Sequence, residues 1–206
     1  MNYEYVSENI IICKDFLPNN MLQKIKIDLL NNRNRFDIPN WSDDKVHLLS
    51  SKCGGLDYWI RNGESTENNE AICELEDWFY HQGFFQFIQH SGRLNAFHFL
   101  RKTKQHNIHV ISYNNGGYYN WHPDSEFFTF NLVLNEGDEL KGGDMLFMDE
   151  NRIVEIPNQN NLMIVFPTYI HHAITPIKSK SGKDVPFPQQ RFSIQYWTDL
   201  NTAHRL

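Results

Sequence analysis

The sequence predicts a mainly β, α+β fold in which two helices near the N-terminus precede a double-stranded β-helix, or jelly roll. Two observations lead to this prediction. The first part of the chain contains two stretches whose apolar residues recur at helical spacing. The remainder contains roughly eight short runs rich in β-branched and aromatic residues, separated at close intervals by turn residues. Helices followed by closely spaced strands are typical of an α+β chain with a double-sheet β domain.

The N-terminal part is predicted to contain one strand and both helices. Residues 9–16 are rich in β-branched side chains and fit a short strand. A helix over residues 18–31 would place its apolar residues on one face. Residues 36–66 are polar and rich in turn formers, and a second helix fits residues 67–90, with Gly83 as a candidate break. The polar stretch nevertheless carries three large aromatic residues: Trp41, Tyr58 and Trp59.

The rest of the chain is predicted to form the strands of the jelly roll. The expected strands are roughly 93–101, 107–113, 127–134, 144–148, 152–156, 162–166, 172–177 and 191–198. No repeat or linker interrupts this pattern, so we expect a single domain over residues 1–206. Within it, residues 1–91 would supply the N-terminal strand, the helices and a lid, and residues 92–200 the jelly-roll core.

Composition and charge limit the classes of function. The chain of 206 residues is 40% hydrophobic and 14% aromatic, which suits a globular domain with a substantial core. Its formal net charge of −6 gives no electrostatic reason to expect a nucleic acid partner. The three cysteines fit neither a disulfide framework nor a cysteine-based zinc site. The first residues lack a basic segment followed by a long apolar run, so we expect a cytoplasmic protein without a signal peptide, transmembrane helix or membrane partner.

A histidine and an aspartate two positions apart are the most informative residues for function. Side chains two residues apart along a strand point to the same side, so His122 and Asp124 can bind one ligand together. Two histidines and one carboxylate form the facial triad that holds iron(II) and leaves coordination positions open. A further histidine follows about 50 residues later, at His171 or His172, and Arg191 follows that.

Residues 107–198 resemble the iron- and 2-oxoglutarate-dependent dioxygenases, specifically the prolyl 4-hydroxylase-like branch. The first motif of that branch, Tyr-x-x-Gly-x-x-Tyr-x-x-His-x-Asp, is matched by Tyr113, Gly116, Tyr119, His122 and Asp124. The next features, a Leu-Asn strand end and a Gly-Gly turn, are matched by Leu134-Asn135 and Gly142-Gly143. The motif around the distal histidine is matched by Phe166, Pro167, His172, Ile174 and Pro176. The closing Arg-x-Ser and tryptophan are matched by Arg191, Ser193 and Trp197. The spacing of Thr129 and Asn131 after His122 is also similar to the lysyl hydroxylase branch.

The resemblance implies which residues bind the metal. His122, Asp124 and His172 would hold one Fe(2+), with the remaining positions for 2-oxoglutarate and O2. His172 is favoured over His171 because it lies four residues before Pro176, as the motif requires. His171 is then expected to point to the other side of its strand.

The resemblance also implies how the cosubstrate binds. The distal carboxylate of 2-oxoglutarate needs a fixed cation, and the planar guanidinium of Arg191 offers two parallel donors. Ser193 would face the same way and add one hydrogen bond. Tyr113 and Asn131 are further candidates for contact with the cosubstrate, and ascorbate is a candidate supporting reductant.

One departure from the family pattern concerns the arginine. In the family it follows the distal histidine by about ten residues, whereas Arg191 follows His172 by 191 − 172 = 19. The extra residues, 178–188, are rich in Lys, Ser, Gly and Pro and fit a loop inserted between two strands. Such an insertion need not move either strand. Lys178 and Lys183, the competing cations, lack the Arg-x-Ser context.

The resemblance predicts an oxygenase that hydroxylates a residue in a protein or peptide, with proline as the first guess. The alternatives are a hydroxylase of a free amino acid or another small molecule, and a non-catalytic binding module on the same fold. A hydrolytic zinc site would not need the Arg191-Phe-Ser193 sequence. A halogenase would lack the carboxylate that Asp124 supplies, and a nucleic acid demethylase is disfavoured by the acidic charge.

Two segments are expected to form mobile loops at the mouth of the site. Residues 36–66 and the insertion 178–190 are polar and lack periodicity. Trp41, Tyr58 and Trp59 are the residues of the first segment that we expect to meet the substrate.

Overall fold

Two antiparallel sheets form the centre of the molecule in the computed structural model, which describes residues 1–37, 55–61, 68–91 and 96–200. The major sheet comprises, in spatial order, β1 (Asn2–Tyr5), β2 (Ile11–Lys14), β10 (Leu162–Pro167), β6 (Phe128–Leu134), β13 (Arg191–Leu200), β4 (Thr103–Tyr113) and β3 (Gly55–Arg61). The minor sheet comprises β5 (Tyr119–His122), β11 (His172–Ile174), β8 (Met145–Asp149) and β9 (Arg152–Ile156). A two-stranded ribbon pairs β7 (Leu140–Lys141) with β12 (Lys178–Ser179). The predicted jelly roll agrees with this arrangement of two stacked β layers.

The two faces of the major sheet have different partners. Even-numbered residues of β6 and β13, such as Phe130 and Tyr196, belong to the apolar core shared with the helices. Odd-numbered residues of the same sheet, such as Val133 and Ile111, pack with residues of the minor sheet such as Phe147. Alternation of side chains along a strand therefore divides the interior into an outer core and an inner core. Every side chain of β6 is buried because both of its faces are covered.

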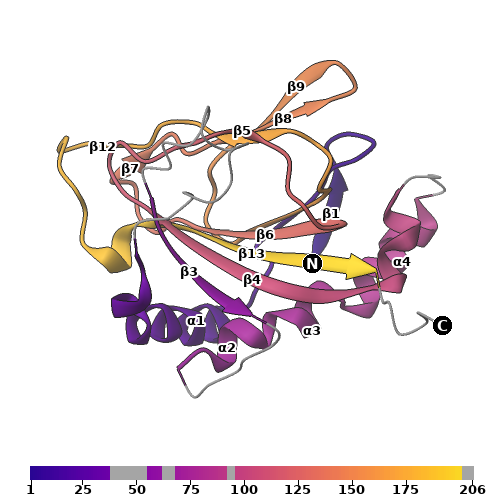
Figure 1. The fold of residues 1–206 in the computed structure, drawn as a ribbon, viewed down its shortest axis with the longest axis horizontal. Coiled ribbons are helices and arrows are strands. Elements are labelled where there is room, and N and C mark those ends of the chain that lie inside the picture. Colours follow the sequence, from indigo (N-terminus) through magenta and orange to yellow (C-terminus); the bar gives the residue numbers. More distant parts are fainter. Residues whose placement is uncertain (38–54, 62–67, 92–95, 201–206) are drawn as a thin grey trace.

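Helices cover the outer face of the major sheet, opposite the minor sheet (Figure 1). The first predicted helix is confirmed as α1 (Asn19–Asn31). The single helix expected over residues 67–90 is instead three short ones: α2 (Glu70–Cys73), α3 (Leu75–Phe79) and α4 (Gln82–His90). The break before α4 occurs at His81, which has extended backbone angles of φ −58° and ψ 139°. Its ring accepts a hydrogen bond from the Gly83 N–H at 3.0 Å, which begins the new helix.

Two other expectations about elements were wrong. The strand expected over residues 93–101 is, in its described part, the 3₁₀ helix η3 (Ala96–Lys102). Phe97 and Leu100 are buried three residues apart while Phe99 is 51% exposed, which is a helical pattern rather than an alternating one. Residues 36–66 contain β3, a seven-residue strand that pairs with β4 along its whole length. Its polar neighbours in sequence hide this strand from a composition-based prediction.

The inserted segment 178–190 has a defined structure. It begins with β12 and ends with the 3₁₀ helix η4 (Phe187–Gln189). The Asn114 side chain donates to the Val185 carbonyl and accepts from the Val185 N–H. The Phe187 ring packs 5.1 Å from that of Phe36 and 5.2 Å from that of Phe192. Whether the segment moves when a ligand binds stays a prediction.

Candidate metal and cosubstrate site

Strands β5 and β11 bring the two predicted histidines together across an antiparallel pair. His122 ends β5, His172 begins β11, and the two are paired directly opposite one another. Asp124 follows β5, and its N–H donates to the Thr168 carbonyl at 3.0 Å. One ligand atom from each of the three side chains lies within 4.8 Å of the others. The Nε2 atoms of His122 and His172 each lie 3.7 Å from a carboxylate oxygen of Asp124.

Backbone carbonyls orient both imidazoles. The Nδ1 atom of His122 is 2.7 Å from the Asn120 carbonyl oxygen, and that of His172 is 3.0 Å from the Ile170 carbonyl oxygen. A carbonyl only accepts, so each Nδ1 carries the proton and each Nε2 turns a lone pair toward Asp124. Burial lowers the pKa of His172 to about 4, so its ring is neutral near pH 7. Neutral imidazole is the form that binds a metal ion.

The carboxylate of Asp124 has an environment that a cation would stabilise. Burial raises its pKa, while the nearby His122 and a hydrogen bond from the Thr129 hydroxyl act in the opposite direction. A buried carboxylate is costly unless a positive charge compensates it. The Nε2 of His172 has no hydrogen-bond partner among the described residues, although it is fully buried. Two imidazole nitrogens and one carboxylate therefore fit a divalent transition metal such as Fe(II).

The structure brings His172, and not His171, to the other two predicted ligands. His172 is 1% exposed and belongs to the ligand cluster. His171 is exposed on the other side of the chain, and its carbonyl accepts the Met148 N–H at 2.8 Å.

Arg191 is fully buried on the inner face of the major sheet with part of its guanidinium unpaired. Its Nη1 donates to the Ser193 hydroxyl at 2.9 Å. Its Nε and Nη2 have no hydrogen-bond partner among the described residues. These two atoms form one edge of the guanidinium fork, which is the edge that binds a carboxylate through two parallel hydrogen bonds. Burial lowers the pKa of Arg191 to about 10, so the group remains a cation near pH 7. A buried cation with a free fork fits an anionic ligand.

The Gly-Gly turn makes room for this arginine. Gly143 has a φ of +76°, and a Cβ placed on it would lie 2.9 Å from Cδ of Arg191. The turn thus needs glycine both for its backbone conformation and for the close approach of the Arg191 side chain. Lys178 and Lys183, the competing cations, are exposed on the inserted segment.

Tyr113 and Asn131 lie on the same inner face as Arg191. The guanidinium carbon of Arg191 is 5.2 Å from the centre of the Tyr113 ring. The Asn131 Nδ2 donates to the Met145 sulfur at 2.9 Å. Its Oδ1 is buried without a hydrogen-bond partner in the described part of the chain. Contact of either residue with the cosubstrate stays a prediction.

The three aromatic residues that were expected to meet the substrate lie in different parts of the molecule. Trp59 lies on the inner face of β3 and is half-buried. Tyr58 lies on the opposite, outer face, where it is 4% exposed and packs 5.1 Å from the Phe36 ring. Because adjacent strand residues point to opposite faces, the two cannot both line the site, and Tyr58 belongs to the outer core. Trp41 lies outside the described residues.

Sequence reasoning missed two residues of the inner face, Asp57 and His109. The Nε2 of His109 is 2.8 Å from the Asp57 carboxylate, and both side chains are buried. His109 shares the strand β4 and the odd-numbered face with Tyr113, which was the only available signal.

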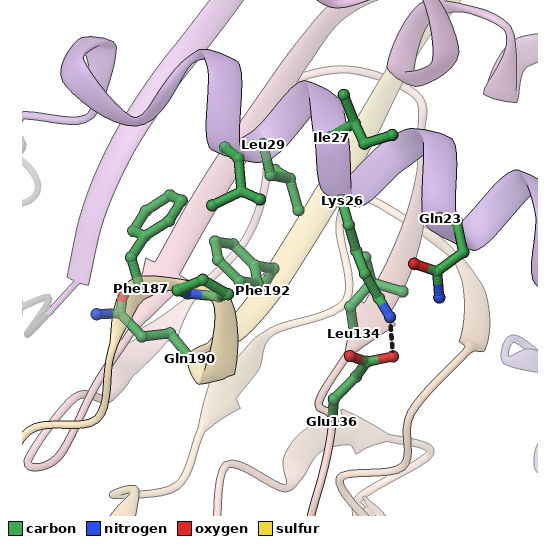
Figure 2. A pocket seen from close by; sticks show the side chains of 11 residues that line it. Gln23, Lys26, Ile27, Leu29, Leu134, Glu136, Phe187, Gln190 and Phe192 are labelled. Carbon is green, nitrogen blue, oxygen red and sulfur yellow. Dashed lines mark ion pairs between the residues drawn. The ribbon is translucent and has the colours of Figure 1, made fainter.

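A separate hollow lies outside the jelly roll, between α1 and η4 (Figure 2). Its volume is about 170 Å³, and Leu29, Phe187 and Phe192 contribute to its apolar wall. An ion pair between Lys26 and Glu136 lies at its edge. The hollow is on the outer side of the major sheet, so it is distinct from the metal site.

Comparison with known proteins agrees with the site. Residues 108–199 match the 2OG-Fe(II) oxygenase superfamily, and they include all three metal ligands and Arg191. The matched region carries an intact His-Asp-His triad, and this match implies Fe(II) as the cofactor and 2-oxoglutarate as the cosubstrate. No curated protein matches the sequence significantly.

Several solved structures share the fold. A prolyl hydroxylase from Trichoplax adhaerens, in complex with a hypoxia inducible factor peptide fragment, is 19% identical with a TM-score of 0.68, covering 95% of this chain and 86% of that one. A Pseudomonas putida prolyl-4-hydroxylase is 15% identical with a TM-score of 0.63, covering 93% and 92%. The viral collagen prolyl hydroxylase of Paramecium Bursaria Chlorella virus-1 is 18% identical with a TM-score of 0.53, covering 93% and 97%.

None of the helices in the described ranges is long and apolar enough to cross a membrane.

Proposed function

We propose that this oxygenase couples the oxidative decarboxylation of 2-oxoglutarate to the hydroxylation of a residue in a protein or peptide, with proline as the first candidate. The observation that carries the cosubstrate assignment is the unpaired Nε–Nη2 edge of Arg191, buried on the same inner face as the residues around the triad. The likeness in fold to prolyl hydroxylases, one of them bound to a peptide, supports the substrate class.

The residues of the site have distinct roles in this proposal. His122, Asp124 and His172 would hold the iron and leave its remaining positions open. When bound, the iron supplies the redox chemistry by which O2 oxidises both 2-oxoglutarate and the substrate. One oxygen atom enters succinate, the other enters a substrate C–H bond as hydroxyl, and CO2 leaves. The carbonyls of Asn120 and Ile170 keep the imidazole protons on Nδ1, away from the metal.

Arg191 and its neighbours would position the cosubstrate relative to the metal. The guanidinium edge would bind the distal carboxylate, and the Ser193 hydroxyl fixes the guanidinium through Nη1. Tyr113 covers the guanidinium face, and Asn131 is placed to contact the cosubstrate chain. Burial of Arg191 excludes water, which strengthens its electrostatic interaction with the carboxylate.

The test begins with binding under anaerobic conditions. Mn(II) or Fe(II) should bind the protein with a stoichiometry of one, and 2-oxoglutarate should bind only the metal-loaded form. With O2 admitted, succinate should appear, and a panel of proline-containing peptides should raise its rate. Mass spectrometry should then find one added oxygen on proline. Binding of zinc with no 2-oxoglutarate binding would contradict the oxygenase assignment. Oxidation of a free amino acid, with prolyl peptides untouched, would contradict only the prolyl substrate.

A further inference from the structure

The inner face of the major sheet packs largely through apolar side chains, but one row across four strands carries side chains with hydrogen-bonding groups. Neighbouring strands place Trp59, His109, Gln195 and Asn131 directly opposite one another, across β3, β4, β13 and β6. The neighbouring rows on this face contribute Ile111 and other residues to the inner apolar core. The polar row starts at Asn131, a candidate cosubstrate contact, and ends on β3, the last strand of the sheet.

His109 of this row contacts Asp57, which lies in the neighbouring row opposite Ile111. His109 is 1% exposed, and its Nε2 is 2.8 Å from the Asp57 carboxylate. His109 is the only hydrogen-bond or ion-pair partner of the Asp57 side chain within the described residues. A carboxylate can accept about four hydrogen bonds. Asp57 therefore retains capacity for another donor, and its side chain keeps 10% exposure through which a donor can reach it.

Two half-buried tryptophans pack against His109. The Trp59 ring stacks on His109 with centres 4.0 Å apart and an interplanar angle of 12°. The Trp197 ring lies 5.0 Å from Trp59 at 70° and 5.7 Å from His109. Aromatic faces beside a carboxylate attract a cation, because the ring quadrupole and the negative charge act in the same direction.

This cluster is close to the metal site. Trp197 is paired directly with Thr129, whose hydroxyl donates to the metal ligand Asp124. Asp57, His109, Trp59 and Trp197 thus lie on the same side of the sheet as the metal, between it and the β3 edge.

We propose that Asp57, oriented by His109 and flanked by Trp59 and Trp197, is a specificity-determining residue that recognises a cationic nitrogen of the substrate. The substrate class is then a side chain or small molecule with an ammonium or guanidinium group, and the carbon to be hydroxylated lies on the stem between that group and the metal. The proposal rests on the oxygenase function proposed above, and it disfavours a proline ring as the group held here, because a proline ring offers this carboxylate no donor. The formal net charge of −6 favours the approach of such a substrate.

A purely structural role for the pair makes a different prediction. A buried His–Asp pair that only stabilises the fold would affect all substrates equally when it is removed. A recognition role affects charged substrates selectively. The experiment therefore compares two probes with the same carbon stem, N-acetyl-lysine amide and N-acetyl-norleucine amide, the second of which lacks the ammonium group.

The readout is the ratio of kcat/KM for the two probes, from probe-dependent succinate release and mass spectrometric detection of the added oxygen. The wild-type protein should prefer the lysyl probe, or its arginyl counterpart, by about tenfold or more, as expected for one charge-assisted hydrogen bond. Asp57→Asn should bring the ratio close to one. Asp28→Asn removes another buried carboxylate, one that accepts the Ile72 N–H on the outer side of the sheet, and should leave the ratio unchanged. Free lysine, as a further probe, distinguishes a small molecule from a peptide substrate.

Several outcomes would overturn the proposal. These are no response of the wild-type protein to any cationic probe, equal use of the lysyl and norleucyl probes, or an unchanged ratio in Asp57→Asn. A response to N-acetyl-proline amide alone would also overturn it while leaving the oxygenase function intact. Failure of the wild-type protein to bind Mn(II) and 2-oxoglutarate would instead contradict the proposed function itself.

Discussion

At the scale of single residues, burial without a partner is what marks the site. The Nε2 of His172 and the Nε and Nη2 of Arg191 are polar atoms in the interior that no described residue satisfies. Such atoms are rare in folded proteins because each costs free energy. A metal ion would satisfy the first of these atoms, and a carboxylate would satisfy the other two. These unpaired atoms destabilise the unliganded protein, and a ligand that pairs with them removes that cost and so binds more tightly.

Adjacent histidines give a matched test of the metal ligands. We expect His172→Ala to weaken Mn(II) binding by more than about 100-fold, because loss of outer-shell partners alone costs 10–100-fold. His171→Ala should bind the metal like the wild-type protein, since its side chain is exposed on the other side of the chain. Isothermal titration calorimetry measures both. Equal losses in the two variants would show that the register of β11 is wrong.

The cosubstrate anchor can be tested against its neighbouring cations. Arg191→Ala should raise the apparent KM for 2-oxoglutarate by well over tenfold, since loss of a buried charge pair costs about 2–5 kcal/mol. Metal binding should be retained. Lys178→Ala and Lys183→Ala serve as controls, because both side chains are exposed on the inserted segment. A raised KM in a lysine variant, with Arg191→Ala unaffected, would place the anchor in the insertion.

At the scale of elements, α1 shows how one face of a helix stabilises the sheet. Ile25 is fully buried against the outer core, whereas Ile27 on the same helix is 57% exposed. Ile25→Ala should lower the free energy of unfolding by about 2–5 kcal/mol through lost burial and a residual cavity. Ile27→Ala should change it by about 0.5 kcal/mol or less. Urea denaturation measures both, and similar losses would indicate that α1 does not pack as described.

Local pattern decided which elements could be predicted from the sequence. β6 and β10 are continuous apolar runs, and α1 has a clear apolar stripe, so both kinds of element were identified. β5 was missed because it is short and consists of Tyr-Asn-Trp-His, with no clear alternation. β3 was missed because polar residues surround it in the sequence. η3 was mistaken for a strand because apolar residues at alternate positions hid the burial of Phe97 and Leu100.

Local pattern also decided which residues of the candidate site could be predicted from the sequence. Spacing within a single motif identified His122 and Asp124, and the ordered motifs led to His172 and Arg191. The Asp57–His109 pair joins residues 52 positions apart through the pairing of β3 with β4. A contact that depends on the register of two strands, one of them unrecognised, leaves no local pattern in the sequence. For the same reason, the sequence could not predict which face of the sheet the Trp59 and Tyr58 side chains would point to.

At the scale of the whole molecule, the buried neutral His172 makes stability depend on pH. Its pKa is about 4 in the folded state and about 6.5 in an unfolded chain. As pH falls below about 6.5, His172 becomes protonated in the unfolded chain but stays neutral in the folded protein. The free energy of unfolding therefore decreases until about pH 4. The slope from this residue reaches at most about 1.4 kcal/mol per pH unit. The raised pKa of Asp124 acts in the opposite direction and reduces the net slope.

Urea denaturation of the metal-free protein between about pH 4.5 and 7 tests this linkage. The wild-type midpoint should decrease toward low pH, and His172→Gln, which has no titrating ring, should lose most of that decrease. Identical pH profiles for the two proteins would contradict the neutral, buried state of His172.

The inserted segment between β11 and β13 has a consequence for how such proteins are detected and engineered. A search pattern that fixed a gap of about ten residues between the distal histidine and the arginine would pass over this chain. A pattern that required the two strands and let the gap vary would retain it. The segment also turns at the exposed Gly182, where an added Cβ would meet nothing within 4 Å. That turn is therefore a suitable position for inserting an affinity tag or a fluorescent reporter while leaving both halves of the site in place.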